Sequence, residues 1–209
     1  MASDKSLSEG ARAHGPISDR GRSGAYLTGR LLVAMPGIED PRFERAVVFI
    51  CAHDFDHAMG LTVNRPVEGL TVSRLMSRLK IKTPVKPLED LVLMGGPVDQ
   101  ERGFVLHTDD YTSQPSSVAV SPGVMLTSTR EVLEAISAGD PHPRQAVMAL
   151  GYAGWDQGQL EREIRHNVWL TCDADETLLF GDDHAHKWSR ALAKIGVAAE
   201  RLSAQTGRA

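Results

Sequence analysis

An arginine beside an asparagine, placed where an apolar run ends, is the pair of residues in this sequence best suited to hold an anion. Asn64 and Arg65 directly follow the run at residues 59–63, and Pro66 comes next, where strand pairing stops. A guanidinium presents its donors in a fixed fork that matches a carboxylate or a phosphate. The alternative is a structural strand end, in which Asn64 bonds the backbone of a loop. The residue types leave both interpretations open.

Two further corners of the chain are candidates for binding. At Gly95-Gly96-Pro97 the backbone can approach another group closely and present N–H donors to an anion, although the spacing matches no nucleotide-binding loop. Trp155 stands where we predict that the chain passes from a strand into a helix capped by Asp156. It could anchor a ligand or a partner. The structural alternatives, a tight turn and a core tryptophan, are favoured over these binding roles.

Gln159, Glu163 and His107 carry side chains that could bind polar groups or, for the last two, transfer protons. Helical spacing places Glu163 beside the apolar Ile164, which predicts a partly buried carboxylate. We hypothesise that this carboxylate pairs with Arg65.

A basic stripe follows, because residues 69–88 contain five cationic and no acidic side chains. Helical spacing puts Arg74 and Arg78 on one face, and Lys80, Lys82 and Lys86 come next. An anionic partner such as nucleic acid could bind there. A solvated helix face is the favoured alternative, and the formal net charge of −4 argues against nucleic-acid or membrane-surface binding.

Metal and catalytic signatures are weak. Residues 51–57 and 182–186 gather Cys, His and Asp side chains, but polar turn residues are expected at both places, so we predict neither a metal nor another cofactor. Gly-x-Ser-x-Gly, His-Glu-x-x-His and kinase motifs are missing from the sequence. These observations favour a protein that is not an enzyme.

Apolar periodicity predicts the elements that must position these residues. A β-hairpin is expected over 46–64, because two β-branched runs flank a short polar connection. Several strands come before most of the helices, which favours an α+β fold with a mixed or largely antiparallel sheet. Strands are predicted at 31–35, 46–52, 59–64, 91–94, 104–107, 117–120, 124–126, 146–150, 168–171 and 177–180, and helices at 70–79, 128–136 (with a capping box at 128–131), 157–166 and from Asp183 onward.

Length and composition indicate one domain with two tails. The chain has 209 residues, of which 42% are hydrophobic and 24% charged. Residues 1–25 are rich in Ser, Gly and Arg, so we expect a disordered leader, a domain over 26–202 and a frayed tail over 203–209. Two distant cysteines, with no signal peptide and no membrane-spanning run, predict a cytoplasmic protein.

Four segments stand out by their order and spacing: LLVAMP with DPRF at 31–43, GLTVNRP at 60–66, GGPV with GFVLH at 95–107, and GYAGW with GQLExEI at 151–164. Together they resemble the YqgE/AlgH family. That resemblance implies a single α+β (mixed α/β) domain in a bacterial protein, with a split mixed sheet folded into a pseudo-barrel flanked by helices. The family name carries a proposed regulatory role in transcription of an exopolysaccharide pathway, and no catalytic activity or cofactor is implied.

We therefore expect a non-enzymatic regulatory or interaction protein, with transcription as one field of action. Its partner would be an unknown protein or a small anionic ligand. A second hypothesis is a small-anion-binding protein or unrecognised hydrolase using Asn64, Arg65 and Glu163, and a third is direct DNA binding through the stripe from Arg74 to Lys86. The predicted groove comprises Asn64, Arg65, Gly95, Gly96, Pro97, His107, Trp155, Gln159 and Glu163.

Overall fold

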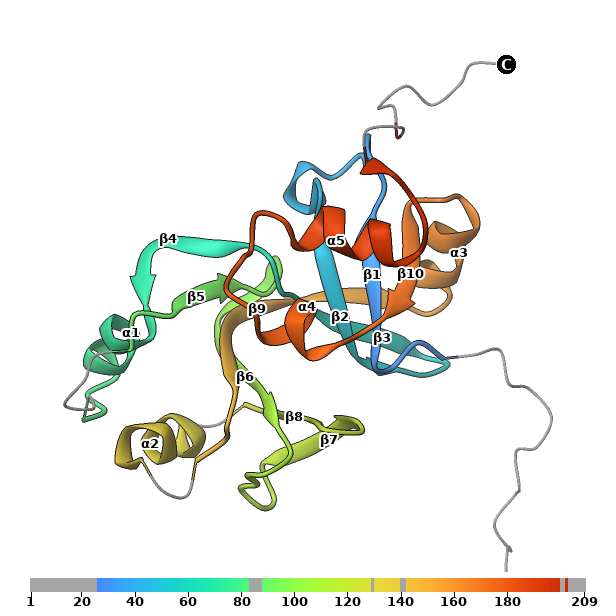
Figure 1. Ribbon diagram of the computed structural model, residues 1–209. Helices are drawn as coiled ribbons and strands as arrows, with labels where there is room; N and C mark the ends of the chain where they lie inside the picture. Colours follow the sequence, from blue (N-terminus) through green and yellow to red (C-terminus); the bar gives the residue numbers. More distant parts are fainter. Residues whose placement is uncertain (1–25, 83–87, 129, 140–141, 200–201, 203–209) are drawn as a thin grey trace, which may run out of the picture.

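The computed structural model describes residues 26–82, 88–128, 130–139, 142–199 and 202 (Figure 1). The predicted leader at 1–25 and tail at 203–209 lie outside these residues, as does Lys86 of the basic stripe. Within the described part, the chain forms a curled sheet with helices around it, which confirms the predicted α+β class.

The sheet runs in the order β10-β1-β2-β3-β9-β6-β8-β7, and the pair β4–β5 branches from β9. Neighbouring strands are antiparallel, apart from the parallel pair β5–β9. The strands are β1 (Arg30–Ala34), β2 (Val47–His53), β3 (His57–Thr62), β4 (Pro66–Thr71), β5 (Leu91–Met94), β6 (Val98–Thr108), β7 (Ser117–Ser121), β8 (Val124–Thr127), β9 (Ala146–Asp156) and β10 (Trp169–Asp173).

Strand β9 joins the two halves of the sheet. Its second half pairs with β3 and its first half with β5 and β6, and Gly151 between them has φ +68°. A Cβ atom on Gly95 would lie 2.3 Å from the Gly151 carbonyl oxygen, and one on Gly96 would lie 2.0 Å from the Tyr152 carbonyl carbon. Only glycine fits where these backbones cross, so Gly95 and Gly96 have a structural role.

The helices pack on both sides of this frame. Figure 1 shows α1 and α2 at one end of the molecule and α3 at the other, with α5 over β1 and β2. Three buried apolar clusters fill the space between the sheet and the helices. The helices are α1 (Val72–Arg78), α2 (Glu131–Ala138), α3 (Gln159–Arg165), α4 (Glu176–Phe180) and α5 (Lys187–Lys194), with a 3-10 turn η1 at Pro41–Phe43.

Residues 177–180, predicted as extended, form helix α4 instead. Asp175 caps this helix by accepting a hydrogen bond from the Leu178 N–H at 2.9 Å, and Leu178 and Leu179 are buried beneath the sheet. A run this short fits either a strand or a helix by pattern alone. The cap and the buried face favour the helix.

Three predicted helix caps are also wrong. Helix α2 begins at Glu131, so its cap position is Arg130 and not the predicted Ser128, and Arg130 makes no side-chain capping bond. Asp156 is the last residue of β9, and Gly158 precedes α3 in the left-handed region. Asp183 bonds the side chain of His186, which holds the cap position of α5. In each case the helix begins two or three residues later than the capping pattern predicts.

Candidate functional site

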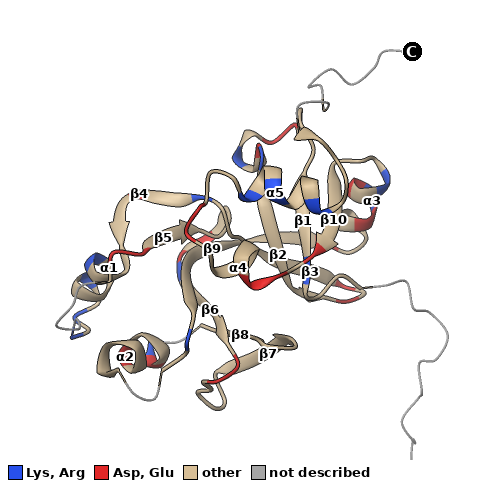
Figure 2. Ribbon diagram, viewed as in Figure 1, with Lys and Arg blue, Asp and Glu red and all other residues tan. Residues whose placement is uncertain are grey.

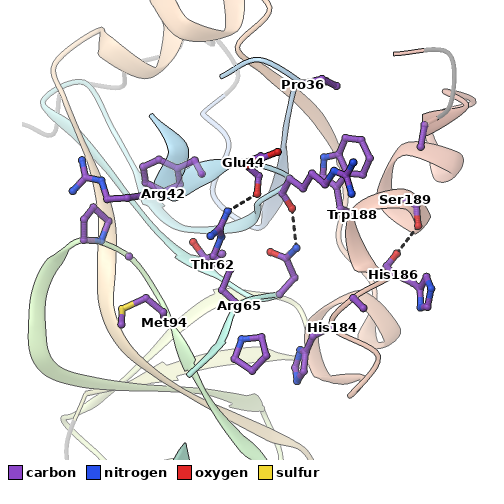
Figure 3. A pocket seen from close by; sticks show the side chains of 18 of the residues that line it. Pro36, Arg42, Glu44, Thr62, Arg65, Met94, His184, His186, Trp188 and Ser189 are labelled. Carbon is purple, nitrogen blue, oxygen red and sulfur yellow. Dashed lines mark hydrogen bonds between the residues drawn. The ribbon is translucent and has the colours of Figure 1, made fainter. Parts of the chain in front are cut away.

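A hollow of about 1090 Å³ opens where the β3–β4 turn, the loop at 36–45 and the start of α5 meet. We call it the arginine hollow, because Arg42, Arg45 and Arg65 line it. Figure 3 shows Arg42 and Arg65 on one side and Trp188 and Ser189 on the other. Among the described lining residues Glu44 is the one carboxylate, so this surface is locally cationic in a chain of net charge −4.

Asn64 fixes the wall of the arginine hollow. Its side-chain oxygen accepts from the Val47 N–H at 2.8 Å, and its amide donates to the Arg45 carbonyl at 2.9 Å. These two bonds tie the β3–β4 turn to the residues that precede β2. Asn64 therefore satisfies loop backbone, as the structural alternative proposed, and in doing so it places Arg45 beside Arg65.

Arg65 projects from the turn into the hollow. Its backbone carbonyl accepts from the Met94 N–H at 2.7 Å, and its Nη2 donates to the Glu44 carbonyl. A guanidinium has five N–H donors. The bond to Glu44 uses one of them within the described structure, and no ion pair there engages the charge of Arg65.

Arg42 and Asp40 form a fork-shaped ion pair at the rim. Arg42 Nη2 donates to Asp40 Oδ2 at 2.7 Å, and its Nε donates to Oδ1 at 3.0 Å. These bonds hold the pKa of Asp40 below its usual value, and Arg65 adds a smaller effect of the same sign. Arg65 is thus near enough to act on the same carboxylate.

Arg45 is held against an aromatic ring. Its guanidinium carbon lies 5.5 Å from the centroid of the Trp188 ring, and its backbone φ is +52°. The indole of Trp188 donates to the Ala34 carbonyl at 2.8 Å, which anchors α5 to β1. This contact fixes the orientation of the Arg45 side chain and leaves its positive charge available to an anion.

A buried lysine lies directly behind the arginine hollow. Lys187 is 1% exposed, and its ammonium donates to the carbonyls of Val63 and Leu179 at 3.0 and 3.1 Å. Burial lowers the pKa of Lys187 to about 8, although Asp182 and Asp183 oppose the shift. Sequence reasoning missed this residue. Its spacing of four from the buried Ala191 was the available signal.

His184 stands between the arginine hollow and a second cavity. Burial lowers its pKa, and the nearby charge of Lys187 adds to this shift. Its Nδ1 atom is buried and makes no hydrogen bond among the described residues. His184 is therefore a neutral imidazole at ordinary pH.

An adjoining hollow of about 850 Å³ holds the other predicted site residues, Trp155, Gln159 and Glu163. We call it the tryptophan hollow. One oxygen of Glu163 accepts from the indoles of Trp155 and Trp169 at 2.9 and 2.7 Å, and the other accepts from Gln159 at 2.7 Å. The predicted pair between Glu163 and Arg65 is wrong. The two indoles reach the carboxylate from inside the domain, while Arg65 lies in the arginine hollow.

The predicted groove is thus divided. Asn64, Arg65 and Gly96 line the arginine hollow, and Pro97 lines both hollows. Gly95 lines neither, because it is packed against β9. Trp155 is 5% exposed and belongs to a core cluster that reaches the surface through the tryptophan hollow.

His107 is a core residue and not part of the groove. It is fully buried in β6, with its ring nitrogens bonded to Thr127 Oγ1 at 2.8 Å and to the Thr108 carbonyl at 2.9 Å. Burial lowers its pKa. Its predicted role in proton transfer at the groove is wrong, since both ring nitrogens have partners inside the fold.

The basic stripe lies on α1, at the far end of the molecule from α3 (Figure 2). Arg74 donates to the Gly69 carbonyl at 2.6 Å, and Arg78, Lys80 and Lys82 are exposed. Binding of an anion by this stripe stays a prediction.

Among the described residues, no group of three His, Cys, Asp or Glu side chains is arranged to hold a metal ion. Cys51 is buried, which raises its pKa to about 12. No helix in the described ranges is long and apolar enough to cross a bilayer.

Fold and site together define a class: a single α+β domain whose split sheet carries an arginine-lined hollow on one flank. Comparison with known proteins identifies the family to which this domain belongs. The AlgH-like family model matches residues 31–200, so the chain belongs to the AlgH-like family, as its motifs predicted.

Relatives support this assignment along almost the full length. A UPF0301 protein of Caulobacter vibrioides is 62% identical over 186 residues, which cover 89% of this chain and 95% of that one. A UPF0301 protein of Bradyrhizobium diazoefficiens is 45% identical, with 98% of both chains covered.

Two solved structures share the fold. The solution structure of the AlgH protein from Pseudomonas aeruginosa superposes with a TM-score of 0.70 at 37% identity, covering 91% of this chain and all of that one. A Corynebacterium diphtheriae protein reaches a TM-score of 0.65 at 19% identity, covering 79% of this chain and 85% of that one. The latter likeness concerns the fold alone.

Proposed function

We propose that this protein is a non-enzymatic interaction protein that recognises an acidic group of a partner protein in the arginine hollow. One observation carries the proposal: three arginines from two separate segments line one hollow. Asp40 already pairs with Arg42, but Arg45 and Arg65 belong to no ion pair among the described residues, so an anion bound in the hollow would meet two unneutralised guanidinium groups. The regulatory role that the family resemblance implies, including action on transcription, is consistent with such binding.

The geometry supports anion binding more directly than catalysis. Arg65 and Arg45 keep donors directed at the hollow, and guanidinium groups suit planar, two-point contact with carboxylates. The hydrolase hypothesis required Asn64, Arg65 and Glu163 to act together. Glu163 lies in the tryptophan hollow, where both its oxygens are already bonded.

The test uses a fluorescein-labelled hexaglutamate peptide and measures its binding by fluorescence anisotropy. Removing one charge-assisted contact costs about 1.5–3 kcal/mol, so Arg65→Gln and Arg45→Gln should each weaken binding by about 10-fold or more. Raising the salt concentration should also weaken it.

Arg102→Gln is the matched control for Arg45→Gln. Arg102 is also exposed and lies 5.1 Å from an aromatic centroid, that of Phe104, but it does not line the arginine hollow. Its loss should leave binding unchanged. Equal binding by wild type, R65Q and R45Q would overturn the proposal. Tight binding of inorganic pyrophosphate with no binding of the peptide would favour a small-anion receptor instead.

A further inference from the structure

The tryptophan hollow carries charge of the opposite sign to the arginine hollow beside it. Its described lining includes the carboxylates of Glu39, Asp40 and Glu163, against the guanidinium of Arg42 and the imidazole of His166. Both hollows share the wall formed by Arg42 and Phe43, so a surface of one sign continues directly into a surface of the other.

From this we infer that the partner binds as an extended peptide segment with an acidic side chain in the arginine hollow and a lysine or arginine side chain in the tryptophan hollow. The inference rests on the proposed function and adds the basic residue of the partner to it. Charge complementarity across two adjoining hollows is the observation that selects this occupant.

The carboxylates of the tryptophan hollow retain charge for a cation. Glu163 accepts hydrogen bonds from two indoles and an amide, all of them neutral donors. Glu39 is exposed and belongs to no ion pair among the described residues. Asp40 differs, because Arg42 already pairs with it. A lysine ammonium would therefore meet two carboxylates that no cation of the described chain neutralises.

Aromatic rings complete the environment of the cation. Trp169 packs edge to face against both Phe43 and Trp155, with ring centroids 5.6 and 6.0 Å apart, and all three residues line the hollow. Trp155 and Trp169 are 5% and 2% exposed, so the half-buried Phe43 is the ring on which the aliphatic stem of a lysine can pack and which can attract its cation.

Size favours a peptide segment over a compact metabolite. Each hollow, at about 1090 and about 850 Å³, is close to the size of one whole small-molecule pocket, about 300–1,000 Å³, so the two adjoining hollows together offer more room than a single compact ligand fills. A hollow of this volume is about 10 Å across, so the two centres lie about 10 Å apart, which an extended chain covers in about three residues. The acidic and basic side chains are therefore expected about three positions apart.

The experiment compares three labelled hexapeptides with blocked ends. One holds Glu and Lys separated by two glycines, the second replaces Lys by norleucine, and the third replaces Glu by Gln. For the wild-type protein, the first should bind about 10-fold more tightly than either of the others. Arg65→Gln should remove the advantage of Glu, and Glu39→Gln should reduce the advantage of Lys.

Glu163→Gln gives a second measure of the lysine contact, with far-ultraviolet circular dichroism to confirm folding. Because Glu39 is exposed, Glu39→Gln keeps the test decisive even if Glu163→Gln fails to fold. Equal binding of the lysine and norleucine peptides, with Arg65 still required, would overturn the inference and leave the proposed function intact. Failure of all three peptides and of hexaglutamate to bind would overturn both.

Discussion

Lys187 gives this protein an unusual dependence of stability on pH. Its ammonium is buried against two carbonyls, and burial lowers its pKa from 10.5 to about 8. The unfolded chain holds this proton more tightly than the folded one. Between pH 8 and 10.5 the unfolded state therefore binds more protons, and the contribution of Lys187 to the free energy of unfolding rises with pH.

The size of the effect follows from the shift. Each pKa unit corresponds to about 1.4 kcal/mol, so protonated Lys187 costs the folded state about 3 kcal/mol at pH 7. About 1.4 kcal/mol of that cost disappears by pH 9 and about 2.5 kcal/mol by pH 10. The titratable groups around the amine are Asp182 and Asp183, which favour its protonated form, and His184, whose own pKa is lowered by burial and by Lys187.

The assay is urea unfolding at pH 7, 8, 9 and 10 for wild type and for Lys187→Met, which keeps the length of the stem. Tyrosines, cysteines and other lysines titrate in both proteins, so their contributions cancel in the difference. We expect the free energy of unfolding of wild type minus that of K187M to increase by about 2.5 kcal/mol from pH 7 to pH 10. A difference that is flat over this range would refute the lowered pKa and the burial argument behind it.

Three further outcomes test the packing. Gly96→Ala should lower the free energy of unfolding by about 3 kcal/mol in urea, because the new Cβ atom would clash with the Tyr152 backbone. Gly123→Ala is the control: its Cβ atom would meet open space, so it should cost only about 1 kcal/mol through its positive φ. Equal losses for the two variants would contradict the close backbone contact at Gly96. Glu163→Ala leaves two indole donors unpaired and should lower the free energy of unfolding by about 3 kcal/mol. Glu163→Gln retains an acceptor for the indoles and should be less destabilised. If the glutamine variant were the less stable of the two, the indole hydrogen bonds would not contribute to stability. Cys51 is buried and its pKa is raised to about 12, so it should react with a thiol reagent at pH 8 only after denaturant is added. Rapid labelling of the native protein would instead show that β2 opens to solvent.

Local patterns in the sequence were sufficient for most elements. The β-branched runs around residues 46–64 form the antiparallel pair β2–β3, and apolar spacing identified α1 and α3. These signals succeed because side-chain period and turn chemistry act over a few residues. The motifs at 31–43, 60–66, 95–107 and 151–164 were also sufficient to identify the family.

Contacts between distant segments required the tertiary structure. The sequence marked Arg65, Trp155 and Glu163 as candidates, but not that they line two different hollows that meet at Arg42 and Phe43. It also did not distinguish a buried Lys187 from an exposed one, since only packing against α4 and the end of β3 removes that amine from water. Chemistry-bearing residue types are visible locally. Which of them share a cavity depends on strand pairings between residues about a hundred positions apart, such as those of β3 with β9.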